Sequence, residues 1–207
     1  MSISKRFVSV FLSILMLLSA AVVFSAPKAD AASKKAKAIA AYKSLLASNS
    51  LLKKFRTDSL SELKFATFYL DNNKVPELVV WQGSDAYLYT YKSKVKKVAY
   101  LKFGSLSEKF QYYKKTGMFI DCGLHSGVIH EGYNKFKGTK ATLKLFRTSR
   151  LSMTATSYTN FKVKKSKNVK ISAKKFKKEL KKLTKKKKKK SAKFYFNTED
   201  NVKKYLK

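Results

Sequence analysis

The sequence predicts an α+β protein in which an antiparallel β-meander sheet is flanked by an N-terminal helix and by C-terminal lysine-rich helices. Apolar residues recur at helical spacing in residues 33–48, at alternating positions through residues 65–171, and again at helical spacing after residue 172. The connections between the alternating segments are too short for the crossover helices that parallel strands need. Hydrophobic residues make up 44% of the chain, which is enough to build a buried core.

The first element is a helix expected over residues 33–48. Ile39, Tyr42, Leu45 and Leu46 form a narrow apolar stripe on an otherwise Ala- and Lys-rich segment. A less regular stretch follows, and from Phe65 onward the apolar period changes to two. This change of period marks the start of the sheet.

The β-rich region, residues 65–171, is predicted to form successive hairpins. The segments KFATFYL, ELVVW, AYLYTYK and KVKKVAYL are rich in β-branched and aromatic residues and are separated by short polar turns. Lys92-Ser93-Lys94 is the expected tip of one hairpin, and turns at Thr116-Gly117 and Lys137-Gly138 join two further pairs. The segments SMTATSYTNFKVK and NVKIS complete the region less distinctly.

The tail, residues 172–207, returns to helix. Ser172 is a suitable N-cap, and Phe176, Leu180 and Leu183 recur at i, i+4 and i+7 on a lysine-rich helix. We expect this stripe to dock against the sheet; the alternative is a helix that lies on an anionic membrane and disrupts it. Thr198 is expected to cap a last short helix.

Lysine dominates the tail. The consecutive lysines at residues 185–190 repel one another and cannot enter a core, so we expect a solvated, mobile loop. This loop and the preceding helix are the predicted contact surface for a polyanion. Its residues are Lys174, Lys178, Lys181, Lys185, Lys186, Lys187, Lys188, Lys189 and Lys190.

The N-terminus predicts export. Lys5 and Arg6 precede an apolar run over residues 7–24, and the small-residue triplet Ala29-Asp30-Ala31 offers a cleavage site. We therefore expect a signal peptide at residues 1–31 and a single secreted α+β domain at residues 32–207. The alternative is an uncleaved membrane anchor.

The charge predicts the class of partner. The chain holds 47 Lys and Arg against 12 Asp and Glu, for a net charge of +35. Outside a cell, such a protein meets anionic cell-wall polymers, anionic lipids and glycan polyanions, and its binding to them depends on salt. We expect no specific nucleic-acid partner, because the export signal argues against one and no RRM pattern or zinc-finger spacing occurs.

One short segment gathers the groups that carry chemistry. DCGLHSGVIHEGY contains Cys122, His125 and His130, and thiolate and imidazole are good zinc ligands as well as a nucleophile–base pair. The alternative functions are thus a small secreted zinc-binding protein or an enzyme centred on these residues. The other interpretation is a Gly-rich turn with a partly buried Cys122. No P-loop, H-E-x-x-H or G-x-S-x-G motif is present, and we assign no catalytic residue.

The segment DNNKVPEL resembles the D-x-D-G-D-G-x-P-E-L calcium loop of FG-GAP-like exported proteins. The resemblance implies calcium ligands at Asp71, Asn73 and Glu77, while Tyr69 and Lys74 stand where the family has an Asp and a Gly. An ammonium group near the site weakens the attraction for calcium, which wants six to eight oxygens. In the alternative interpretation the segment is a hairpin turn, with Glu77 bonding turn amides in the ion's place.

The order of elements across the mature chain also resembles a group of exported proteins of Gram-positive bacteria for which no activity is assigned. The resemblance implies secretion or attachment to the cell envelope, and a fold, but no catalytic residues. The predicted function is that of a cationic, non-catalytic protein, without cofactor, that associates with anionic envelope or extracellular polymers.

Overall fold

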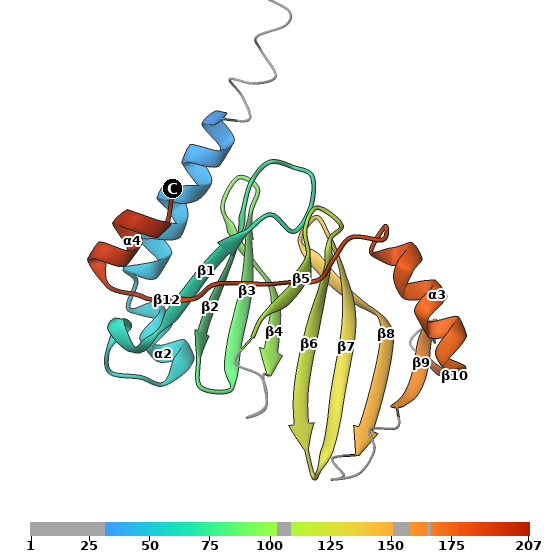
Figure 1. Cartoon of the computed structure of the whole chain (residues 1–207). Helices are drawn as coiled ribbons and strands as arrows, with labels where there is room; N and C mark the ends of the chain where they lie inside the picture. The colour runs from blue at the N-terminus through green and yellow to red at the C-terminus, as the bar shows by residue number, and fades with distance from the viewer. Residues whose placement is uncertain (1–31, 103–108, 151–157, 165–166) are drawn as a thin grey trace, which may run out of the picture.

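The computed structural model describes residues 32–102, 109–150, 158–164 and 167–207, and the predicted signal peptide lies outside these ranges (Figure 1). Within them, no helix is both long enough and apolar enough to cross a bilayer. The α+β prediction is confirmed: antiparallel strands are flanked by an N-terminal helix and by C-terminal helices.

The strands form two sheets instead of one continuous meander. The first sheet has five strands in the order β12-β1-β2-β3-β4, and every pairing in it is antiparallel. Its strands are β1 (Lys64–Phe68), β2 (Glu77–Gln82), β3 (Asp85–Tyr91), β4 (Val95–Lys102) and β12 (Tyr195–Phe196).

The second sheet has seven strands in the order β10-β9-β8-β7-β6-β5-β11, again all antiparallel. Its strands are β5 (Gln111–Tyr113), β6 (Met118–His125), β7 (Val128–Lys137), β8 (Lys140–Arg150), β9 (Tyr158–Lys164), β10 (Lys167–Ile171) and β11 (Lys190–Ser191). The meander therefore holds within each sheet but breaks between β4 and β5.

The helices begin where the sequence predicts. The N-terminal helix spans residues 32–46, and α3 (Ala173–Leu183) and α4 (Glu199–Tyr205) complete the expected set. The Ser172 and Thr198 hydroxyls accept hydrogen bonds from the amides three residues on, so both predicted N-caps are present. The short helices α2 (Ser50–Phe55) and η1 (Leu60–Glu62) were not foreseen.

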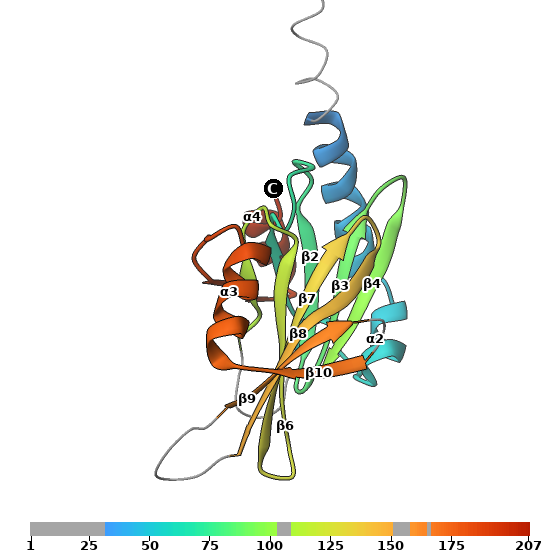
Figure 2. The same ribbon diagram turned by 90° about the vertical axis from the view of Figure 1, so that its right-hand side faces the viewer.

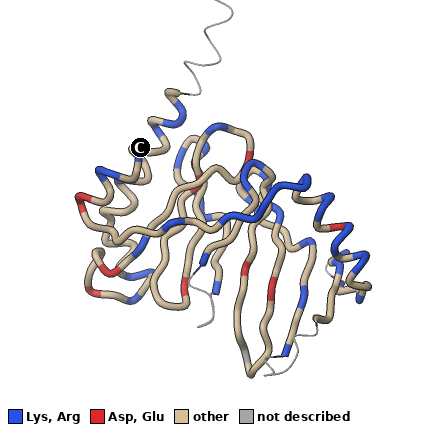
Figure 3. Tube along the Cα trace, viewed as in Figure 1, with Lys and Arg blue, Asp and Glu red and all other residues tan. Residues whose placement is uncertain are grey.

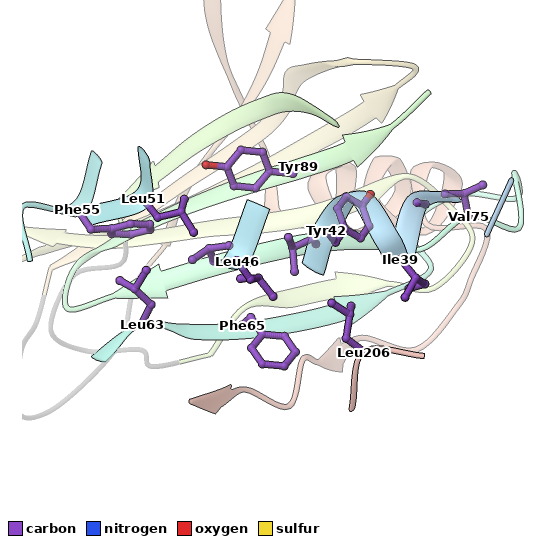
Figure 4. Close-up of a cluster of buried hydrophobic side chains, with 13 residues drawn as sticks. Ile39, Tyr42, Leu46, Leu51, Phe55, Leu63, Phe65, Val75, Tyr89 and Leu206 are labelled. Carbon is purple, nitrogen blue, oxygen red and sulfur yellow. The ribbon is translucent and has the colours of Figure 1, made fainter. Parts of the chain in front are cut away.

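The N-terminal helix covers one face of the first sheet. Ile39, Tyr42 and Leu46 project from it into a cluster with Phe65 of β1 and Tyr89 of β3 (Figure 4). This helix therefore docks by the stripe that the sequence predicts, which closes one side of the sheet.

The opposite face of the first sheet packs against the second sheet. Val79 and Trp81 of β2 belong to one buried cluster with Phe119 of β6 and Phe136 of β7. The run ELVVW is buried on both faces of β2, and a strand of that kind needs a cover on each side. The two-sheet arrangement supplies the second cover.

Helix α3 covers the outer face of the second sheet (Figure 2). Phe176 is 4% exposed and meets Tyr133 edge to face at 5.5 Å between ring centroids, while Leu180 and Leu183 pack around the same cluster. The docking prediction is thus confirmed. Because the apolar stripe lies against the sheet, it is not presented to a bilayer in this structure.

The segment after α3, residues 185–196, ties the two sheets together, and we call it the strap. Its β11 pairs with β5 at the edge of the second sheet, and its β12 pairs with β1 at the edge of the first. Figure 1 shows the strap crossing both sheets between α3 and α4. These two-residue strands carry no periodic signal of their own, so the sequence did not predict them.

Candidate functional site

The turn that resembles a calcium loop is closed by its own side chains. Asp71 Oδ1 accepts the amide of Asn73 at 3.0 Å, and Asn73 Oδ1 accepts the amide of Val75 at 2.8 Å. Lys74 takes the left-handed conformation, with φ 64°, at the position where the family has glycine. Glycine adopts this conformation most readily, so the backbone at Lys74 is compatible with the glycine of the calcium-loop pattern.

Glu77, the closing acid of that loop, is fully buried and satisfied by the protein. Its Oε2 accepts the Leu70 amide at 2.8 Å, and Thr90 lies 3.5 Å from Oε1. Burial raises the pKa of Glu77 to about 8. The hydrogen bond to a backbone amide is the one expected in the ion's place, and calcium binding stays a prediction.

The turn is also fastened to the N-terminal helix. The Tyr42 hydroxyl donates to the Pro76 carbonyl at 2.9 Å, and burial, followed by the proximity of Glu77, raises the pKa of this tyrosine. The side chain of Tyr42 is fully buried beside the loop. The loop is therefore a structural junction between helix and sheet.

The structure separates Cys122 from His130. Cys122 pairs with Glu131 across β6 and β7, and His130, the neighbour of Glu131, points to the opposite face of the sheet. Cys122 packs toward the α3 cluster, whereas His130 stacks on Phe146 with 5.8 Å between centroids. The backbone of His125 ends β6, and its side chain lies outside the description.

The environment of Cys122 keeps its thiol protonated. Burial, with Glu131 nearby, raises the pKa of Cys122. Glu131 itself accepts hydrogen bonds from Arg147 at 2.5 Å and Tyr133 at 2.7 Å; these outweigh its burial and lower its pKa. The described residues contain no group of three or more His, Cys, Asp or Glu side chains placed to hold a metal ion.

On the face of His130, a cavity of about 310 Å³ opens between β4 and the second sheet. Lys102, Asp121, His130 and Asn134 contribute its polar side chains. Asp121 Oδ1 is buried without a hydrogen-bond partner in the structure, and burial raises the pKa of this carboxyl to about 6. The sequence analysis singled out this segment. It did not predict that Asp121 and His130 line the same cavity.

The predicted polyanion-binding lysines are all exposed. Figure 3 shows Lys and Arg positions, in blue, recurring along α3 and the segment that follows it. On α3, Lys174, Lys178 and Lys181 face solvent, whereas Glu179, the acidic residue of this helix, pairs with Lys162 of β9 at 2.8 Å. That ion pair lowers the pKa of Glu179. The outward face of α3 therefore keeps its positive charge uncompensated by its own carboxylate.

The lysine run at residues 185–190 is exposed, as expected, and has defined backbone contacts. Lys185 and Lys186 take left-handed φ angles of 51° and 57°, and the Lys186 amide donates to the Lys181 carbonyl at 3.0 Å, which ends the helix. At the other end, Lys190 pairs with Tyr112 of β5. The run thus forms a turn leading into strand β11, where the sequence suggested only a loop.

A groove of about 620 Å³ lies along the strap, and sequence reasoning missed it. It brings together Lys64 and Trp81 of the first sheet, Lys109 from the segment before β5, and Lys193 and Phe196 of the strap. These residues are up to 132 positions apart by the numbering of Lys64 and Phe196, and β1 and β12 place those two directly opposite each other. The pairing of strands from distant segments leaves no local pattern in the sequence, so the groove could not be predicted from it.

Comparisons with known proteins give no family. No family model matches the chain, and no curated protein matches it. Among solved structures, a Xanthomonas type IV secretion system related protein is similar over 52% of this chain and 57% of that chain, with 12% identity and a TM-score of 0.40. The similarity thus spans just over half of that protein, and at this size it does not establish a shared fold.

Proposed function

We propose that this protein is an exported, non-catalytic binding protein that associates with anionic cell-envelope polymers or other extracellular polyanions. The observation that carries the proposal is the uncompensated lysine surface of α3 and the strap. The lysines at residues 185–190 are exposed, and the carboxylate of α3 is drawn to β9 by Lys162. Export rests on the N-terminal sequence.

The physical basis is long-range attraction with local reinforcement. Helix α3 spans 11 residues, or about 16 Å at the usual helical rise, and the strap continues its line of lysines. The screening length at 0.1 M salt is about 10 Å, so neighbouring ammonium groups on this surface act together on one polymer. Such binding gains from the release of counterions and weakens as salt rises.

Two features support binding without catalysis. Burial raises the pKa of the Cys122 thiol, and a protonated thiol is a poor nucleophile. Cys122 and His130, which the sequence offered as a nucleophile and base, lie on opposite faces of the second sheet.

The test is salt-dependent binding of residues 32–207 to isolated Gram-positive cell walls and to heparin. One variant replaces six lysines of the proposed surface with Gln: Lys174, Lys178, Lys181, Lys187, Lys188 and Lys189. Its charge-matched control replaces six exposed lysines elsewhere: Lys37, Lys43, Lys53, Lys92, Lys94 and Lys96.

We expect the wild-type protein to bind both materials at low salt and to release them at high salt. The surface variant should bind at least tenfold more weakly, with a slope of log affinity against log salt that is smaller by about 5 if each lysine releases one counterion. The control should lose much less. Absence of wild-type binding at low salt would refute the function, and equal losses in both variants would refute its location.

A further inference from the structure

The groove along the strap combines charge with aromatic surface. Lys64, Lys109 and Lys193 contribute ammonium groups to it, and none of the residues that line it is acidic. The aromatic part of the lining comes from Trp81, Phe194, Tyr195 and Phe196, and the groove has a volume of about 620 Å³. A volume of this size accommodates a small-molecule-sized segment of a polymer.

The aromatic rings orient the lysines. Lys64 Nζ lies 5.6 Å from the Trp81 ring centroid and 5.1 Å from that of Phe196, and Lys193 Nζ lies 5.4 Å from the Tyr195 centroid. An ammonium group held over a ring face is attracted by the ring's quadrupole. Two of the three charges are therefore already positioned at the groove before any ligand arrives.

Phe196 is the ring that faces solvent. Its side chain is 51% exposed, whereas Trp81 is 6% exposed, packs edge to face on Phe194 and donates its indole N–H to the Gly83 carbonyl at 2.6 Å. Trp81 is thus part of the wall. An exposed aromatic ring among lysines offers a flat apolar contact that a simple cation-rich surface lacks.

These features select a ligand with two kinds of surface. The apolar C–H face of a sugar ring can lie on an aromatic face, while its carboxylate, sulfate or phosphate groups pair with ammonium groups. A polyphosphate chain has the charges without the ring, and an uncharged glycan has the ring without the charges. The groove fits the ligand that carries both.

We propose that the strap groove binds one segment of an acidic carbohydrate polymer. The ring of Phe196 stacks on a sugar, and Lys64, Lys109 and Lys193 pair with the acidic groups on either side. This inference rests on the proposed polyanion-binding function and adds to it a defined site, apart from the lysines of α3, that distinguishes sugar polymers from other polyanions.

The experiment compares two probes of similar charge, a heparin oligosaccharide and inorganic polyphosphate, by titration calorimetry at low salt. Phe196→Ala should lower the affinity for the oligosaccharide about fivefold or more, as the loss of one stacking contact does in single-strand nucleic-acid binding. The affinity for polyphosphate should stay within twofold of the wild-type value. Phe196→Tyr keeps the ring and should retain the wild-type affinity for both probes. Melting curves of each variant verify that the fold is kept.

The lysines are tested with a charge-matched pair of triple variants. Lys64→Gln, Lys109→Gln and Lys193→Gln together should weaken the oligosaccharide more than Lys164→Gln, Lys167→Gln and Lys170→Gln, which remove the same charge from the exposed lysines of β9 and β10. If the two triples behave alike, or if Phe196→Ala affects both probes equally, the groove inference is overturned while the proposed function stands.

Two further outcomes are distinct. If oligothymidylate binds more tightly than the oligosaccharide and Phe196→Ala abolishes that preference, the groove is a single-strand nucleic-acid site and the inference is overturned. If the wild-type protein binds none of the probes at low salt, the proposed function fails and takes the inference with it.

Discussion

At the residue scale, Glu77 holds the turn before β2 through a buried hydrogen bond. The carboxyl lies fully buried at the start of β2 and accepts a hydrogen bond from the Leu70 amide. This bond connects the two ends of the turn. Burial raises its pKa to about 8, so at neutral pH the group is mostly protonated.

The raised pKa predicts a pH dependence of stability. From pH 4.5 to pH 8 the unfolded chain releases the Glu77 proton while the native protein keeps it, so the free energy of unfolding falls as pH rises. The fall amounts to about 1.4 kcal/mol per pH unit at most. Glu77→Gln keeps a hydrogen-bonding side chain that does not titrate. At pH 8 the free energy of unfolding of this variant should exceed that of the wild type by about 2–4 kcal/mol.

Urea unfolding of both proteins at pH 5 and pH 8 measures this difference. Asp121 also has a pKa raised to about 6, so the comparison uses the change from wild type to variant at each pH and not the wild-type curve alone. Asp58→Asn, at an exposed position before β1, is the control and should leave the pH profile unaltered. A Glu77→Gln profile parallel to the wild type would show that Glu77 does not titrate in this range.

At the element scale, the strap explains why the C-terminal end belongs to the same domain as the N-terminal helix. Asn197, which directly follows the strap, is buried; its backbone amide donates to the Leu63 carbonyl and its side chain donates to the Leu46 carbonyl, both at 2.8 Å. Leu46 is the last residue of the N-terminal helix. The Asn197 side chain thus joins the segment before α4 to the end of the N-terminal helix.

Asn197→Ala should destabilise the protein by about 1–3 kcal/mol, because the Leu46 carbonyl loses its buried donor. Asn201→Ala is the matched control: its side chain makes an exposed hydrogen bond to the Phe196 carbonyl at 3.0 Å, and its loss should cost less than about 1 kcal/mol. Denaturant unfolding of the two variants gives the comparison. Equal losses would mean that the bond to Leu46 contributes no more than a surface contact.

At the scale of the whole molecule, the high positive charge destabilises the folded state. A net charge of +35 on 207 residues produces repulsion that is larger in the compact state than in the unfolded chain. The described ion pairs, such as Glu179 with Lys162, remove only a small part of it. A bound polyanion or a higher salt concentration should therefore stabilise the folded protein.

Thermal unfolding of residues 32–207 in increasing sodium chloride tests this expectation. Between about 10 mM and 200 mM salt, the screening length falls from about 30 Å to below 10 Å, and the melting temperature should rise by several degrees. Potassium fluoride at equal ionic strength is the control and should give the same rise if screening is the cause. A melting temperature that stays constant or falls would show that the repulsion is not a major term.

Much of the local structure followed from the sequence because its causes are local. Alternating apolar residues gave the strands from Lys64 to Ile171, and Ser172 and Thr198 announced their helices through caps that act over three residues. The apolar stripe of α3 correctly predicted that this helix docks on a sheet. Composition alone gave the cationic character. The export signal at residues 1–31 stays a prediction from the N-terminal pattern.

The tertiary structure decided what depends on residues far apart. It divided the strands into two sheets, because β2 is apolar on both faces and needs a cover on each, and it sent Cys122 and His130 to opposite faces through the strand alternation at Glu131. It also laid Phe196 beside Lys64 to form the strap groove. Sequence patterns record the period of each element, whereas the side chains that meet across elements are fixed by which faces must be buried together, and only the packed chain settles that.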